Sequence, residues 1–229
     1  MLARSRNQAV IKLYGSLHSR ALRNAWMLRE LGLEWENVPT NFQDGSTRTP
    51  EFLAINPNGR VPALDDDGLR LCESLAINLY LARKYGGPLA PRAMEEEALA
   101  TQWSFWVITE IEKPLLLAAA NRVLFEPASA RREAEVEIAL GKLARPWGVL
   151  NAHLQRQAYL VNEHFTVADL NVASVMTLLP LAGIDIEAWP SMQRWLRECL
   201  DRPAVADWKD VSFKIPRPET ALEMLRMFV

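Results

Sequence analysis

The sequence predicts a small mixed α/β domain followed by an all-helical domain. Strand and helix signals alternate over residues 1–87, and a short segment at 88–93 is flanked by prolines. From residue 94 onward, nearly every periodic segment has helical spacing. We therefore divide the chain into a first domain over 1–87, a linker over 88–93 and a helical domain over 94–229.

Within the first domain, the segments appear in the order β-α-β and then β-β-α. The first β-prone run ends at Gly15, and the helix expected over 19–31 is followed by Gly32. An Asp-Asp-Asp-Gly turn over 65–68 predicts a hairpin between the last two strands. The expected strands are 10–14, 34–38, 61–64 and 69–72, and the second helix runs from Ser74, as its N-cap, to Tyr85. This order favours a small mixed sheet covered by helices.

In the second domain, helices are expected over 95–117, 130–154 and 166–181. One helix start is marked unusually well. Thr166 and Asp169 have the spacing of a capping box, and Phe165 and Leu170 occupy the hydrophobic staple positions around it. Removing Asp169 should therefore cost about 1 kcal/mol or more in stability. No element is assigned to the proline-broken tail over 212–229.

Composition excludes several classes of function. The chain has 229 residues with 26 Lys and Arg against 28 Asp and Glu, a net charge of 26 − 28 = −2, so it offers no general field for nucleic acid. It has neither an 18-residue apolar run nor a signal-peptide start, so no membrane partner is expected. The two cysteines form no CxxC pair and no zinc spacing, which predicts no metal site and favours a reducing, cytoplasmic location.

Three segments together resemble one family. They are Leu-Tyr-Gly-Ser-Leu-His-Ser over 13–19 with Arg23 four residues on, Asn-Pro-Asn-Gly-Arg-Val-Pro-Ala-Leu over 56–64 with Cys-Glu-Ser over 72–74, and the capping box followed by Arg-Pro-Ala-Val over 202–205. In order and spacing, they resemble the cytosolic glutathione S-transferase family, of bacterial type with a serine-type site. The resemblance implies a thioredoxin-like domain with the order β-α-β-α-β-β-α, then a helical domain, and a homodimer.

Glutathione carries two carboxylates, an ammonium and a thiol, so its site needs both anionic and cationic partners. Ser74 and the helix start behind it suit the γ-glutamyl carboxylate, and Glu73 suits the ammonium. The alternative is that Ser74 only caps the helix and Glu73 is only a favourable acid in its first turn.

The resemblance also implies that the Val61–Pro62 peptide is cis and that the backbone of Val61 pairs with the cysteinyl part of glutathione. Arg60 stands where it could reach the glycyl carboxylate. The alternative for Arg60 is a solvated surface side chain.

Ser19 is the expected catalytic residue, because a hydroxyl near a helix start can stabilise the glutathione thiolate. The alternative is a plain N-cap serine, and Ser16 is the second candidate. Tyrosine-type and cysteine-type members carry their catalytic residue where this chain has Gly15 and Arg20. His18 is expected to shape the acceptor pocket.

Trp106, from an aromatic cluster in the helical domain, is a second candidate for the acceptor pocket. The function expected is conjugation of glutathione, as co-substrate, to a small hydrophobic electrophile, with no other cofactor. The alternatives are a glutathione-dependent reductase or isomerase, or a non-catalytic binding protein.

Overall fold

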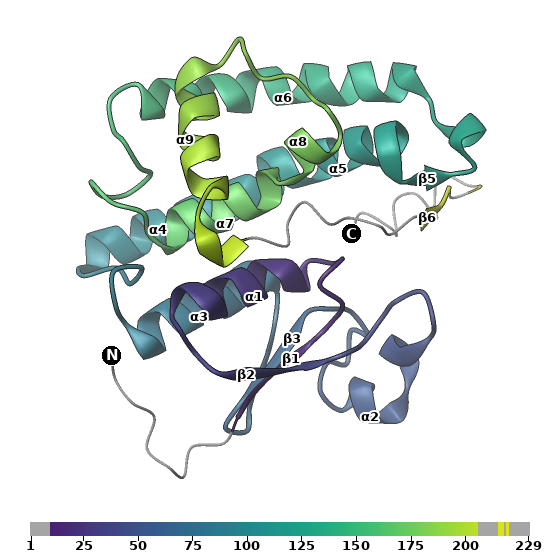
Figure 1. The fold of residues 1–229 in the computed structure, drawn as a ribbon, viewed down its shortest axis with the longest axis vertical. Coiled ribbons are helices and arrows are strands. Elements are labelled where there is room, and N and C mark those ends of the chain that lie inside the picture. The colour runs from purple at the N-terminus through teal and green to yellow at the C-terminus, as the bar shows by residue number, and fades with distance from the viewer. Residues whose placement is uncertain (1–9, 206–214, 218, 220–229) are drawn as a thin grey trace. The chain divides into compact units, whose positions relative to one another are not determined.

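The computed structural model describes residues 10–205, 215–217 and 219. The chain divides into two compact units, one ending at Pro91 and the other beginning at Arg92 (Figure 1). This division lies inside the segment over 88–93 that the sequence marks as a linker.

The first unit is built on a four-stranded sheet in the order β2-β1-β3-β4. Strand β1 is parallel to β2 and antiparallel to β3, and β3 is antiparallel to β4. Tyr14 pairs with Ala63, which pairs in turn with Cys72, so the end of β1, the start of β3 and the end of β4 meet at one edge of the sheet. The strands are β1 Ile11–Tyr14, β2 Trp35–Val38, β3 Ala63–Asp66 and β4 Leu69–Cys72.

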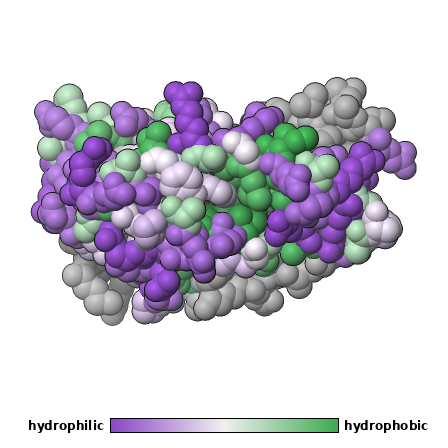
Figure 2. Space-filling model, turned by 90° about the horizontal axis from the view of Figure 1, so that it is seen from above, coloured by the Kyte–Doolittle hydropathy of each residue, from purple (hydrophilic) through white to green (hydrophobic). Residues whose placement is uncertain are grey.

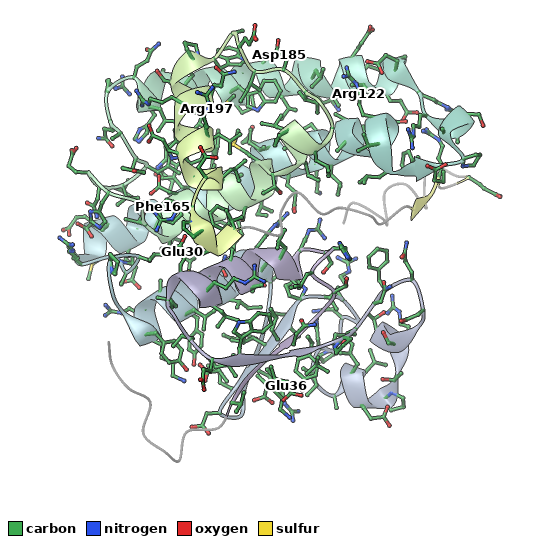
Figure 3. All side chains as sticks on the ribbon, in the orientation of Figure 1. Glu30, Glu36, Arg122, Phe165, Asp185 and Arg197 are labelled. Atoms are coloured by element: carbon green, nitrogen blue, oxygen red, sulfur yellow. The ribbon has the colours of Figure 1, made fainter. Side chains whose placement is uncertain are left out.

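Helices cover this sheet as the sequence predicts. Helices α1 (Ala21–Glu30) and α3 (Ser74–Tyr85) pack side by side on one face (Figure 1). Side chains alternate along a strand, so Tyr14 faces away from the fully buried Leu13 and contacts Phe52, with ring centroids 6.1 Å apart. Phe52 belongs to the short helix α2 (Pro50–Leu53), which follows the 3₁₀ turn η1 (Ser46–Arg48). Figure 3 shows Glu30 near the end of α1, where its carboxylate accepts a hydrogen bond from the indole of Trp26.

The second unit is helical over the segments that the sequence predicts. Helix α4 packs against α7, α5 against α6, and α9 against both α6 and α7. The bounds are α4 Met94–Trp106, η2 Val107–Glu112, α5 Lys113–Ala119, η3 Ala120–Leu124, η4 Ala128–Ala130, α6 Glu133–Leu154, α7 Val167–Met176, α8 Leu178–Leu181 and α9 Pro190–Leu200.

Two features of the second unit depart from the sequence reading. The helix expected over 95–117 widens into a π-turn at η2, and a second π-turn, η3, follows at the end of α5. Pro114 accounts for η2, because its ring clashes with the carbonyl one turn earlier and its nitrogen has no hydrogen to donate. The prediction of an all-helical domain is also wrong in one detail, since β5 (Phe125–Glu126) pairs in parallel with β6 (Ile215–Pro216). Neither two-residue strand is long enough to leave a period in the sequence.

Some apolar side chains of the second unit are exposed. Ile138 and Val149 are exposed on α6, and Figure 2 shows hydrophobic residues gathered among hydrophilic ones on this side of the molecule. Among the described residues, no helix combines the length and the apolar character needed to cross a membrane.

Candidate functional site

The loop between β1 and α1 is in close contact with the first turn of α1 and with the segment before β3. The Gly15 amide donates to the Val38 carbonyl at 3.1 Å, which continues the pairing of β1 with β2. Gly15 has φ +143°, and a Cβ built on it would lie 2.7 Å from the Cβ of Ala21 and 3.4 Å from that of Val61. Only glycine fits here, so the loop, the first turn of α1 and the segment before β3 are in contact.

Ser19 lies in this loop, two residues before α1. Its hydroxyl donates to the Ser16 carbonyl at 2.7 Å and accepts a hydrogen bond from the Ala21 amide at 3.2 Å. Its Oγ would lie 3.6 Å from a Cβ on Gly15, which places it close to the contact with Val61. Helix α1 begins at Ala21 with Arg20 as its N-cap, so the alternative reading of Ser19 as the N-cap is wrong, although the Ser19 hydroxyl accepts from the first helical amide.

Ser16 and His18 are two further polar residues of the loop, which ends at Arg20. The Ser16 hydroxyl accepts a hydrogen bond from the His18 amide at 3.2 Å, and the Ser16 amide donates to the Thr40 carbonyl at 3.1 Å. Nδ1 of His18 is buried and makes no hydrogen bond in the described part of the chain. The Ser16 hydroxyl thus shapes the loop, whereas Ser19 joins the loop to the helix.

The Val61–Pro62 peptide is cis. Val61 stands two residues before Ala63, where the pairing of β3 with β1 begins. Its backbone therefore lies just before the start of β3, outside the ladder of paired strands. An extended peptide can pair with backbone in such a position.

Glu73 and Ser74 lie at the start of α3, but not in the positions expected. Ser74 is the first residue of the helix rather than its N-cap, and Glu73 occupies the capping position with φ +68° and no capping bond from its side chain. The sequence reading was wrong because a serine before a helical pattern is usually the cap, and the positive φ of Glu73 is not readable locally. Positive φ is uncommon for such a residue and suggests a functional constraint.

The hydroxyl of Ser74 is held by a buried polar cluster between α1 and α3. Arg23 Nη1 donates to Ser74 Oγ at 3.2 Å, and Asn24 Nδ2 donates to the Ser74 carbonyl at 2.7 Å. Asn24 Nδ2 also donates to Asn78 Oδ1 at 2.7 Å. The cluster fixes the helix start and puts a guanidinium beside it, so this end of α3 suits an anion. Sequence reasoning gave Arg23 no role, although it stands one helical turn after Ser19.

Arg60 is exposed, and its carbonyl accepts a hydrogen bond from Asn56 Nδ2 at 2.7 Å. Arg48, which the sequence analysis missed, lies across Gly59, with Nη1 2.5 Å from the place of a Cβ there. Gly59 has φ +61° and lacks the side chain that would block this approach. The Arg48 guanidinium therefore lies against Gly59, which Arg60 follows in the chain. Arg48 makes no ion pair with any acid in the described ranges.

The three groups of residues share one edge of the sheet. Ser19 follows the end of β1, Val61 precedes the start of β3, and Glu73 follows the end of β4; these strand ends are level with one another. In the residues that the structure describes, no cluster of three or more His, Cys, Asp or Glu side chains is arranged to hold a metal.

Trp106, Thr166 and Asp169 belong to the second unit. Trp106 is half-buried at the end of α4, with its ring 5.0 Å from that of Trp103 in an edge-on contact. The capping box is present, with Asp169 Oδ2 accepting hydrogen bonds from the amide and the hydroxyl of Thr166, both at 3.0 Å. Asp169 also accepts from the Leu160 amide and from the indole of Trp195, both at 2.9 Å. It is therefore the centre of a buried hydrogen-bond network.

Comparison with known proteins places this chain and its fold in a family. The models of the N-terminal and C-terminal domains of glutathione S-transferase match residues 9–83 and 113–203. Glutathione S-transferase 1 of Zea mays is 36% identical over 208 residues, covering 86% of this chain and 94% of the relative. Glutathione S-transferase D7 of Drosophila melanogaster is 30% identical, covering 78% of each chain.

Solved structures agree. Glutathione S-transferase I from maize, in complex with an atrazine glutathione conjugate, superposes with a TM-score of 0.80 at 33% identity, covering 89% of this chain and all of that one. A theta-class glutathione S-transferase from Xanthomonas axonopodis pv. citri with glutathione bound has a TM-score of 0.79 at 29% identity, covering 90% and 99%. The chain belongs to the glutathione S-transferase family. The curated relatives quoted come from a plant and an insect, so they add no support for a bacterial type.

Proposed function

We propose that the protein transfers glutathione to small hydrophobic electrophiles and that Ser19 stabilises the reacting thiolate. The observation that carries this proposal is the meeting of Ser19, Val61 and the Glu73–Ser74 helix start at one edge of the sheet. Family membership supplies the reaction class, and this geometry supplies the residues.

The hydrogen bonds of Ser19 suit this role. The Ala21 amide donates to its oxygen, and a hydroxyl that accepts such a bond becomes a stronger donor. Rotation about the Cβ–Oγ bond takes the hydroxyl hydrogen from the Ser16 carbonyl to a sulfur atom without moving the backbone. The positive end of the α1 dipole, two residues away, favours the thiolate as well. The thiolate then attacks the electrophile, forming the carbon–sulfur bond and displacing the leaving group.

The remaining residues hold the tripeptide. The γ-glutamyl carboxylate receives the Ser74 hydroxyl hydrogen and lies at the α3 N-terminus beside Arg23, while the exposed Glu73 carboxylate pairs with the ammonium. The Val61 backbone pairs with the cysteinyl backbone. Arg48 and Arg60 together take the glycyl carboxylate.

The test is the ultraviolet absorbance of bound glutathione thiolate, titrated across pH. Free thiols ionise near pH 8.5, and we expect the bound thiol of the wild type to ionise well below that value. Ser19→Ala should return the ionisation toward 8.5 and lower the rate of conjugation to an aromatic halide at least about tenfold, with glutathione affinity retained. Ser16→Ala, in the same loop, is the matched control and should leave both quantities near wild type.

Each contrary result has a meaning. Unchanged ionisation in Ser19→Ala and a loss in Ser16→Ala would transfer the role to Ser16. An unshifted thiol in the wild type would favour a non-catalytic binding protein. Reduction of a glutathione mixed disulfide without conjugation would favour the reductase alternative.

We also propose a homodimer that acts in cytoplasmic detoxification, with the dimer covering apolar side chains of α4. Met94 is 82% exposed and Phe105 69% exposed, and they lie on one face of the helix because eleven residues make three turns. Apolar residues exposed along one face are typical of an interface. Cys72 and Cys199 are free thiols, which suits a reducing compartment. Sedimentation of the wild type and of Phe105→Glu would test the dimer.

A further inference from the structure

The C-terminal segment of the chain is docked on the connection between α5 and α6. Ile215 pairs with Phe125, and Pro216 pairs with Glu126, in the parallel β5–β6 ladder. Strands β5 and β6 both belong to the second unit. Arg122, labelled in Figure 3, lies near the end of α5 that leads into β5. The family model of the C-terminal domain matches residues 113–203, so residues 215–217 lie beyond the matched part of the chain and the residues that they contact lie within it.

Arg217 makes the strongest contacts of the segment. Its Nη2 lies 2.6 Å from Glu135 Oε1, and its Nη1 donates to Asn121 Oδ1 at 2.7 Å and to the Ala130 carbonyl at 3.2 Å. The guanidinium lies 5.1 Å from the ring centroid of Phe125, which is fully buried. The Arg217 side chain is only 11% exposed, so a charge is removed from water and met by a carboxylate, two further acceptors and an aromatic face.

The acceptors for Arg217 are held in place by residues other than the segment itself. Asn121 donates to the Leu117 carbonyl and to Glu135 Oε2, both at 3.1 Å, and its Oδ1 also accepts from the Arg132 amide at 3.1 Å. These bonds orient the amide and the carboxylate that receive the guanidinium. The site is therefore organised in advance for a forked donor.

A second arginine fixes the loop beneath the strand. Arg131 donates to the carbonyls of Phe125 at 2.9 Å and of Arg122 and Val123 at 3.1 Å each, and it pairs with Glu126 at 3.0 Å. These are carbonyls at the end of η3 and in β5, which a helix end otherwise leaves without donors. Strand β5, which pairs with Ile215, is thus held by contacts of Arg131 that do not involve residues 215–217.

The backbone ladder alone is a weak attachment. It is two residues long, and Pro216 has no amide hydrogen to donate. Specific attachment must therefore come from the Arg217 side chain.

We propose that the α5–α6 connection, residues 121–135, is a peptide-binding cradle that recognises an extended segment through its arginine side chain, and that its occupant is residues 215–217 of the same chain. Arg217 is the anchoring side chain. The cradle attaches residues 215–217 to the helical unit. These residues lie beyond the matched family domain.

The experiment compares two truncated proteins, one ending at residue 217 and one ending at residue 214. We expect the chain ending at 217 to unfold like the full chain, and the chain ending at 214 to have a Tm about 3–8 °C lower. Hydrogen exchange of the Arg132 amide should become at least about tenfold faster in the shorter chain. In the full chain, Arg217→Ala should reproduce most of both effects.

Arg132→Ala is the matched control. Its guanidinium is 3.6 Å from the same Glu135 oxygen, but its side chain is 67% exposed, so it should change Tm by no more than about 2 °C. Equal Tm and equal exchange for the two truncated chains would overturn the proposal. A loss on truncation that Arg217→Ala does not reproduce would overturn the anchoring role of Arg217.

A synthetic peptide of residues 213–219, added at millimolar concentration to the chain ending at 214, should restore protection of the Arg132 amide in a saturable way, because a ligand of the folded state stabilises it by mass action. The same peptide with alanine at position 217 should not. Failure of the first peptide, or equal action of both, would contradict recognition of the segment. Protection in the full chain that rises with protein concentration would place the tail of a second copy in the cradle and would overturn the assignment to the same chain.

Discussion

Replacing Asp169 with alanine should destabilise the second unit more than any single surface substitution. The carboxylate is fully buried and accepts four hydrogen bonds, from the Leu160 amide, the Trp195 indole, and the amide and hydroxyl of Thr166. Alanine leaves three buried N–H groups without an acceptor, because only the hydroxyl can turn to another partner. At about 1–2 kcal/mol for each unsatisfied group, the loss is about 3–6 kcal/mol. That is several times the cost of about 1 kcal/mol for an ordinary capping residue.

Asp169→Asn is the matched control because it keeps the shape and one acceptor oxygen. Burial raises the pKa of Asp169, while its donors lower the pKa by less, so the carboxylate charge itself is not favoured at this position. The asparagine oxygen still accepts from Leu160 and Trp195, but its NH₂ group faces the Thr166 amide. We expect a loss of about 1–3 kcal/mol, smaller than that of alanine.

The assay is thermal unfolding followed by calorimetry, with the three proteins at the same concentration. At about 2–4 °C per kcal/mol, alanine should lower the Tm of this unit by about 6 °C or more, and asparagine should fall between alanine and wild type. Ionisation of bound glutathione, measured below the transition, should stay at the wild-type value because Ser19 belongs to the other unit. An alanine variant within about 1 kcal/mol of wild type, or an asparagine variant as unstable as alanine, would refute the reasoning.

Three further predictions concern the first unit. Gly15→Ala forces a Cβ to within 2.7 Å of Ala21 in a conformation with positive φ, so kcat for conjugation should fall at least about tenfold; wild-type kcat would contradict the close contact. Glu73→Ala should weaken glutathione binding by about 1.5–3 kcal/mol in calorimetry, and unchanged affinity would mean that the ammonium binds elsewhere. Burial lowers the pKa of Lys84, but its hydrogen bonds to Asp66 and to a tyrosine raise it by more, to above the ordinary 10.5. The stability that Lys84 contributes is therefore complete below 10.5 and is lost as the pH rises beyond it. The advantage of wild type over Lys84→Met in urea unfolding should stay constant up to about pH 10 and shrink as the pH rises from about 10.5 to 11.5, and a constant difference over that range would argue against this ion pair.

The sequence by itself determined the features that depend on neighbours along the chain. Helical spacing of Ala21, Ala25 and Leu28 predicted a buried face, and all three side chains are fully buried in α1. The Thr166–Asp169 pair was readable because a capping box closes within four residues. The order of the four strands and of α1 and α3 followed in the same way, from periods and turn residues, whereas the helix between β2 and β3 was implied only by the family resemblance.

Only the tertiary structure decided how distant residues meet. Arg23 reaches Ser74 across 51 positions, and Arg48 reaches the backbone of Gly59 because that glycine has no side chain. The position of Ser74 inside α3 depends on the positive φ of Glu73, which the surrounding fold imposes and no local propensity favours.

The attachment of the C-terminal segment shows the same limit most clearly. Arg217 bonds to Asn121 across 96 positions, beside a two-residue strand pairing. Neither strand is long enough to show a periodic pattern in the sequence. Periodicity and capping report interactions within a few residues, whereas contacts of this kind exist only once the chain has folded back on itself. The sequence therefore determined most elements of this protein, and the tertiary structure decided which charges the candidate site residues face.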